Sequence, residues 1–149
     1  MMRLRYLGVA TVLAVVGGMT AFAADLENAD PAVQYRVNVM RGISANASAI
    51  GLTLRNNLPQ TQNLGLHAEA IALGARTAVS AFQPNVPDGV AKPEVWEDQA
   101  DFQGRLLKLA AAADDVAHAA REQGINAAKP KLDVMFPMCK SCHDVYRKK

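Results

Sequence analysis

The sequence lacks most of the features by which common functional classes are recognised. Of its 149 residues only two are cysteine and three are histidine, and His67 and His118 stand alone. A structural zinc site needs four ligands, so these residues do not form a recognisable zinc motif. We find no internal repeat and no strand–helix–strand pattern of the kind that surrounds a thioredoxin-like cysteine pair. The chemistry of this chain must therefore depend on few residues.

The chain also lacks a strong net charge and a long hydrophobic run. Arg3 and Arg5 belong to the first 23 residues, and without them 14 basic residues face 14 acidic ones. A net charge near zero supplies no electrostatic field for nucleic acid or for an anionic membrane. We therefore expect no nucleic-acid partner. The longest apolar stretch, residues 6–20, is short for a membrane span of roughly twenty residues.

Residues 1–23 have the organisation of a secretory signal peptide. Arg3 and Arg5 precede the apolar stretch, and Ala21-Phe22-Ala23 is a small-x-small cleavage site. We predict cleavage after Ala23, which leaves residues 24–149 as one domain with no membrane attachment. An uncleaved anchor is the alternative interpretation.

The remaining residues predict an all-α protein, because the hydrophobic periods are helical and β-branched alternation is scarce. Breaks at Pro, Gly and Asn residues divide the chain into four helices, with Asp30-Pro31 as the first N-cap. Short connections and one longer crossing loop suit an antiparallel four-helix bundle. Pro137 predicts a kink near Asp133 or a new helical turn from Phe136. The predicted helices cover residues 31–54, 64–82, 94–123 and 127–147.

The most informative motif is Cys139-Lys140-Ser141-Cys142-His143. This is the Cys-x-x-Cys-His pattern of c-type haem attachment, in which two thiols bind the haem vinyl groups and the histidine ligates iron. A thioredoxin-like redox pair, half of a zinc site and a short-loop disulfide with an incidental histidine are the alternatives. We expect one covalent haem c per chain, attached through Cys139 and Cys142 with His143 as the axial ligand.

Helical spacing places further residues beside the expected haem. Cys139, Cys142 and His143 share one stripe of the last helix, so all three can face the bundle interior. Arg36 and Met40 are an i, i+4 pair on the apolar face of the first helix. A cation on an apolar face is costly unless it is paired, and haem propionates would supply that pairing. Met135 and Met138 are expected to pack against the haem edges, whereas His67 and His118 are unfavourable ligand candidates.

Three segments carry a resemblance to the cytochrome c′ family of periplasmic four-helix-bundle haem proteins. They are the closing run from Cys139 to Arg147, the Val33-Gln34-Tyr35-Arg36 segment, and Lys92-Pro93-Glu94-Val95-Trp96 through Phe102. The resemblance spans the whole of residues 24–149. It implies a periplasmic location, propionate contacts from Arg36 and Arg147, and a homodimer through the first two helices.

Met40 decides between two functions that the resemblance implies. The low-spin cytochrome c-556 branch is similar to this chain in having methionine four residues after the first-helix arginine. Met40 would then be the sixth iron ligand opposite His143, and the protein would carry electrons between periplasmic redox partners. The alternative is a five-coordinate haem that binds or buffers nitric oxide or other small gases, with Met40 as a core residue. An enzyme is not expected, because this face offers no acid–base group and no catalytic residue.

Overall fold

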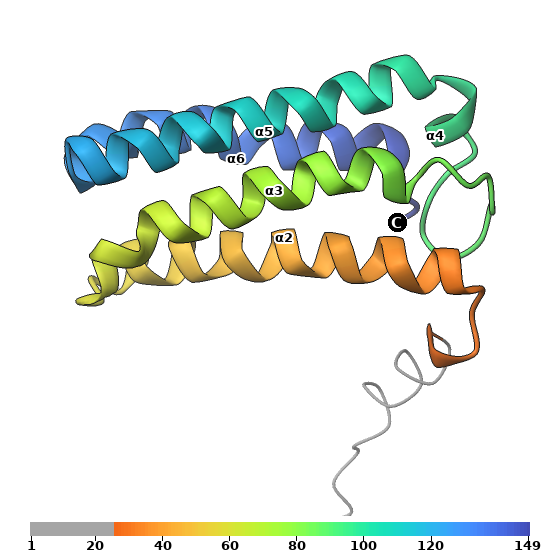
Figure 1. Ribbon diagram of the computed structural model, residues 1–149, viewed down its shortest axis with the longest axis horizontal. Helices are drawn as coiled ribbons and strands as arrows, with labels where there is room; N and C mark the ends of the chain where they lie inside the picture. Colours follow the sequence, from red (N-terminus) through yellow and green to blue (C-terminus); the bar gives the residue numbers. More distant parts are fainter. Residues whose placement is uncertain (1–25) are drawn as a thin grey trace, which may run out of the picture.

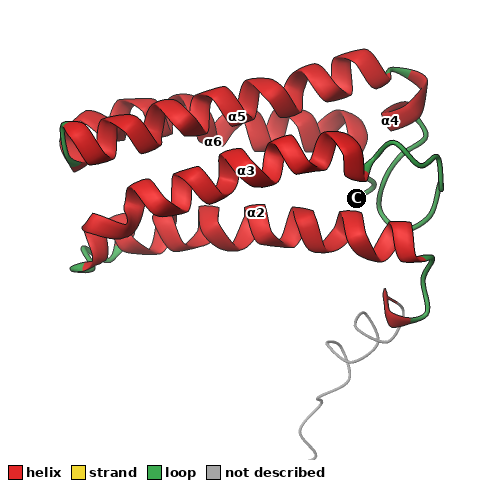
Figure 2. Ribbon diagram, viewed as in Figure 1, coloured by secondary structure: helices red, strands yellow, loops and turns green. Residues whose placement is uncertain are grey.

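The computed structural model describes residues 26–149, and the predicted signal peptide lies outside them. Nearly all of this region is helical, and an isolated antiparallel bridge between Ala91 and Arg147 is its only extended pairing (Figure 2). The prediction of an all-α protein is therefore confirmed. The elements in chain order are α2 (Pro31–Arg55), η1 (Gln60–Asn63), α3 (Leu64–Ala81), α4 (Glu94–Glu97), α5 (Gln99–Glu122) and α6 (Ile125–Tyr146).

Helix α2 begins and ends where its sequence predicts. The Asp30 side chain accepts a hydrogen bond of 2.7 Å from the Ala32 backbone N–H, and Pro31 occupies the first helical position. The helix ends at Arg55, and Asn57 follows in a left-handed conformation (φ 50°) that asparagine tolerates well. Local chemistry alone therefore fixes both ends of α2.

The third predicted helix is wrong in one respect, because residues 94–123 form two helices rather than one. The short α4 ends at Glu97, and the backbone of the next residue, Asp98 (φ −119°, ψ 55°), is not helical. The Asp98 side chain then caps α5 by accepting a bond from the Asp101 N–H. A good N-cap residue inside an otherwise helical pattern is the feature that marked this break.

Helix α6 runs through both of its prolines. Pro130 and Pro137 lie inside the Ile125–Tyr146 helix, so of the two alternatives a new helical turn from Phe136 is wrong, and the kink near Asp133 stays a prediction. Proline removes one backbone hydrogen bond, and the burial of Leu132 and Met135 against the core holds the surrounding turns in place. The residues of the predicted attachment motif, Cys139 to His143, therefore all lie on one unbroken helix.

The four long helices pack in the cyclic order α2, α3, α5, α6. Helix α3 lies along both α2 and α5, and α5 lies along α6, whereas α6 and α2 make few contacts. The bundle is therefore most open between its first and last helices, although Ile43 and Ile50 of α2 share a buried core with Leu132 and Met135 of α6. The loop from α3 to α4 crosses the end of the bundle next to the C-terminus (Figure 1). None of the helices within residues 26–149 combines the length and hydropathy that a membrane span requires.

Candidate functional site

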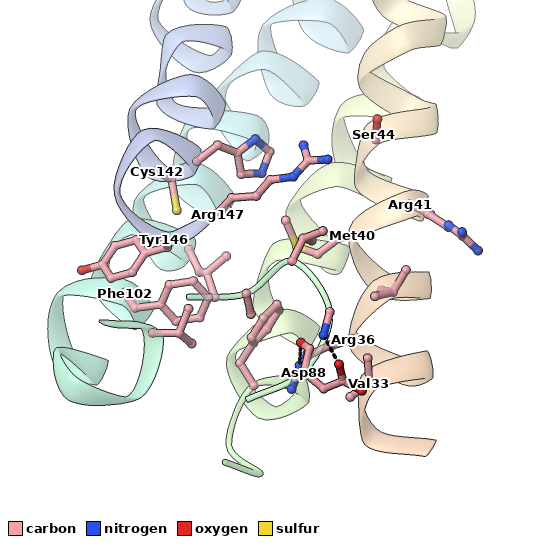
Figure 3. A pocket seen from close by; sticks show the side chains of 18 of the residues that line it. Val33, Arg36, Met40, Arg41, Ser44, Asp88, Phe102, Cys142, Tyr146 and Arg147 are labelled. Atoms are coloured by element: carbon pink, nitrogen blue, oxygen red, sulfur yellow. Dashed lines mark hydrogen bonds between the residues drawn. The ribbon is translucent and has the colours of Figure 1, made fainter. Parts of the chain in front are cut away.

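A cavity of about 460 Å³ lies between α2 and α6, at the end of the bundle that the α3–α4 loop crosses. This volume falls within the usual range for a cofactor pocket. Most of the lining is apolar, and the polar groups come from a few residues, among them the buried Arg36. Figure 3 shows Val33, Arg36 and Met40 on α2 facing Cys142 and Tyr146 on α6 across this space.

The α6 wall contains the second half of the predicted attachment motif. Cys142, His143, Tyr146 and Arg147 all line the cavity. Burial, together with the nearby Arg147 cation, lowers the pKa of His143 below its usual value. The imidazole is therefore neutral at neutral pH, which is the form that binds a metal ion.

Cys139 lies one helical turn before Cys142 and is half-buried against the main core rather than in the cavity lining. Both cysteines are free, so the short-loop disulfide is not formed. Burial raises the pKa of each thiol. Within residues 26–149 no three His, Cys, Asp or Glu side chains gather as a metal-binding cluster, and the zinc interpretation gains no support.

The α2 wall places Met40 in the same cavity as His143. Val33, Val37 and Met40 line this wall, and Arg41 and Ser44 continue it toward solvent. The first-helix face is thus the one that the spacing of its apolar residues predicts. A group held between the two walls would meet an imidazole on one side and a thioether with two valines on the other.

Arg36 is the most unusual residue of the cavity, because only 2% of its surface is exposed. Its guanidinium lies over the rings of Phe82 and Trp96, at 5.7 and 5.2 Å from the ring centroids. Nη2 donates a 2.6 Å hydrogen bond to the Asp88 carbonyl oxygen, whereas Nη1 has no partner. Burial lowers the pKa of Arg36, which shows how poorly its charge is solvated.

These residues fit a covalent haem. The unpaired Nη1 leaves a buried cationic donor at an apolar cavity, and a buried donor without a partner costs about 1–3 kcal/mol. A propionate would satisfy that donor and its charge together. Thiols, imidazole and guanidinium are the groups that a haem c requires, and all come from the predicted residues. Arg147 also lines the cavity, and within residues 26–149 it forms no ion pair with an acidic side chain.

Sequence reasoning missed the contacts that hold the last turn of α6. The Tyr146 hydroxyl donates a 2.6 Å hydrogen bond to Asp101, which also accepts a 2.5 Å bond from Arg105 Nε. The ring of Tyr146 packs edge-on against Phe102 at 5.1 Å. Burial, with the hydrogen bond to Asp101, raises the pKa of Tyr146 to about 12, so its hydroxyl stays protonated and keeps this bond. The one feature of the sequence that could have indicated these contacts is the i, i+4 spacing of Asp101 and Arg105, which favours an ion pair on a helix.

The remaining candidates lie away from the cavity. His67 forms a 2.9 Å hydrogen bond with Asn46 between α3 and α2, and His118 is exposed on α5. Neither histidine lines the cavity. Met135 and Met138 belong to the main core and do not line the cavity, so their predicted role at the haem edge is not supported.

The sequence is similar to those of known proteins over most of its length. Residues 31–147 match the family model described as Cytochrome C'. The chain is 35% identical over 125 residues to a cytochrome c' of Rhodospirillum rubrum, an alignment that covers 80% of this chain and 84% of the relative. It is 29% identical to a cytochrome c' of Pararhodospirillum photometricum, with 77% and 94% of the two chains covered.

Solved structures show the same fold. Ferric cytochrome c prime from Alcaligenes xylosoxidans superposes with a TM-score of 0.71 at 24% identity, over 79% of this chain and 94% of that chain. Another structure, with the same score and coverage, is the nitric oxide complex of a variant of that protein. At this level of identity the likeness concerns the fold alone, and the prediction of a four-helix bundle is confirmed.

Proposed function

Because the chain belongs to the cytochrome c′ family of c-type haem cytochromes, we propose that it is a periplasmic protein whose haem binds small gases such as nitric oxide. The support comes from the α2 wall of the cavity, where Val33, Val37 and Met40 offer no charged group opposite His143. The relatives that match over most of the chain are cytochromes c′, and a variant of one of them forms a nitric oxide complex. These observations favour gas binding over the electron-carrier function that Met40 predicts from the sequence.

The residues have separate parts in this proposal. Cys139 and Cys142 would hold one haem c through thioether bonds, and His143 would supply a nitrogen ligand to its iron. Arg36 would bind a propionate through its free Nη1, and Arg147 would contribute a second positive charge. When bound, the haem supplies an iron that coordinates a diatomic gas. The apolar side chains of Val33, Val37 and Met40 would keep water away from their part of the cavity.

A second candidate function rests on Met40. Its side chain lines the cavity that also contains His143, so a thioether is available on the α2 side (Figure 3). If Met40 ligates the iron, the protein is a six-coordinate electron carrier that exchanges electrons with periplasmic redox proteins. Thioether ligation favours the reduced state, since it raises the reduction potential.

An absorption spectrum with carbon monoxide separates the two functions. For gas binding, the reduced holoprotein is high-spin and binds carbon monoxide rapidly at micromolar concentration. Met40→Ala then leaves the spin state unchanged, because Met40 only packs in the wall. A low-spin reduced spectrum that becomes high-spin in Met40→Ala would instead establish the electron carrier and contradict our proposal.

The control for this substitution is Met138→Ala. Met138 is a partly buried methionine of α6 that packs against the main core and does not line the cavity. Both variants lose a similar packing area, so a general loss of stability affects both spectra alike. A change confined to Met40→Ala reports on the haem side of α2.

A further inference from the structure

A short segment of the α3–α4 loop, which we call the strap and define as residues 88–92, joins the two walls of the cavity. At one end the Asp88 carbonyl oxygen accepts the 2.6 Å hydrogen bond from Arg36 of α2. The next residue, Gly89, adopts a left-handed backbone conformation (φ 67°) that glycine takes without strain. A side chain added there would contact Val33 at 3.6 Å, so the strap lies directly on α2.

The other end of the strap is fixed to the C-terminal tail. The Lys92 N–H donates to the Tyr146 carbonyl oxygen (3.0 Å), and the Lys148 N–H donates to the Val90 carbonyl oxygen (2.8 Å). Two ammonium groups reinforce the pairing, because Lys92 Nζ donates to the Val145 carbonyl (2.9 Å) and Lys148 Nζ to the Gly89 carbonyl (3.1 Å).

These bonds matter because they join α2 to α6 at the cavity end of the bundle. The backbones of the two helices make few close contacts, and the buried side chains that they share, Ile43 and Ile50 with Leu132 and Met135, belong to the main core rather than to the cavity lining. The strap pairs with the tail that follows His143 and binds the arginine that precedes Met40 by one turn. It therefore links the two walls through hydrogen bonds to both of them.

We propose that the strap is a positioning element, which holds the Met40 wall of α2 at a fixed distance from His143 of α6 and thereby controls access to the haem iron. With the strap in place, α2 keeps Met40 and Val37 close to the cavity that His143 lines from α6. When the strap is released from the tail, α2 moves outward more easily and a gas reaches the iron faster. This inference rests on the proposed function for its gas-binding readout only.

Lys148→Pro tests the proposal in the holoprotein. Proline removes the N–H that bonds Val90, and the extended backbone of Arg147 (φ −118°, ψ 133°) suits a following proline. Lys149→Pro is the matched control, because it removes the same charge and adds the same ring, but the Lys149 N–H has no recorded bond to the strap. Lys148→Ala keeps the backbone bond and isolates the contribution of the ammonium group.

The first readout is the distance between α2 and α6, which does not depend on gas binding. Spin labels at Ala45→Cys and Val134→Cys, both exposed, report it by pulsed electron paramagnetic resonance. The attachment cysteines carry the haem and do not take a label. We expect a longer and broader distance distribution in Lys148→Pro, and the wild-type distribution in Lys149→Pro and Lys148→Ala. Identical distributions in the two proline variants would overturn the proposal.

The second readout is the association rate of carbon monoxide after flash photolysis. We expect Lys148→Pro to bind about three- to tenfold faster, in the range by which residues along a coupling path change affinity. Equal rates in the two proline variants would also count against the strap. If the wild-type protein binds no carbon monoxide, the proposed function fails, and the spin-label distances still decide this inference.

Discussion

The two sides of the bundle are built on different principles. Between α3 and α5 the core is rich in alanine, and these small side chains let the two helices approach closely. Between α2 and α6 the corresponding space is a cavity lined by valine, methionine, arginine and the attachment motif. One side is thus closed by its own side chains, and the other has the size and chemistry to be completed by a cofactor. The buried alanines on the closed side are Ala68, Ala72, Ala75, Ala110, Ala113 and Ala117.

The two sides also differ in buried charge. Arg36 is the only charged residue among the buried side chains of residues 26–149, and it lies at the open side. A lone buried cation destabilises a protein, whereas one paired with an anionic cofactor does not. We therefore expect filling the open side to stabilise the protein.

The largest expected effect comes from preventing haem attachment. The double variant Cys139→Ser, Cys142→Ser removes both thiols, and we expect the free energy of unfolding to fall by about 4 kcal/mol. This is the stabilisation from a group present at about a thousand times its Kd. Chemical denaturation of the purified variant measures it. Ser141→Ala, which keeps both thiols, is the control, and equal stability of the two variants would refute a structural role for the haem.

A smaller effect is expected from overpacking the closed side. Ala75 is fully buried between the helices, so Ala75→Leu forces them apart and should cost about 1–3 kcal/mol. The haem spectrum should stay unchanged, since Ala75 does not line the cavity. Leu73→Ala on the same helix, where the side chain is 66% exposed, should change stability by less than about 0.5 kcal/mol. A thermal melt of the two variants with the wild type makes the comparison, and equal midpoints would contradict close packing here.

The smallest effect concerns the junction between the two sides, where Tyr146 bonds Asp101. The pKa of Tyr146 is raised from 10.0 to about 12, so the folded state favours its protonated form. The resulting stabilisation is fully present below pH 10 and is lost as the pH rises toward 12. We expect the wild type to lose stability over this interval and Tyr146→Phe to lose less. Denaturation at pH 9 and pH 11.5 gives the two differences, and an equal loss in both proteins would be the contrary result.

The closed side and the element boundaries were largely predictable from sequence. The Asp30-Pro31 cap and the Asn56-Asn57 stop are local signals, and they place both ends of α2 to within one residue. The break at Asp98 was missed, because the hydrophobic period continues through it and only tertiary packing decides whether a cap is used. The predicted last helix ran through Pro137, but a new helical turn at Phe136 was left open, because the spacing does not show that the burial of Met135 outweighs one lost hydrogen bond.

The site was predictable where its residues lie on one helix. Spacing alone identifies the shared face of Cys142 and His143 and the pairing of Arg36 with Met40. The stacking of Arg36 on Phe82 and Trp96 and its bond to Asp88 were not predictable, because these partners come from distant segments joined only by the fold. Cys139 lies half-buried beside the cavity rather than in its lining, which periodicity does not distinguish.

The most direct test of the account is the absorption spectrum of the purified, exported protein after denaturation in alkaline pyridine. A haem held by two thioether bonds stays with the unfolded chain and gives the spectrum of a c-type haem, with one haem for each chain. We predict that result. A chain that shows no Soret absorption, or that releases its haem to acidified acetone, would contradict a covalent haem in the cavity between α2 and α6.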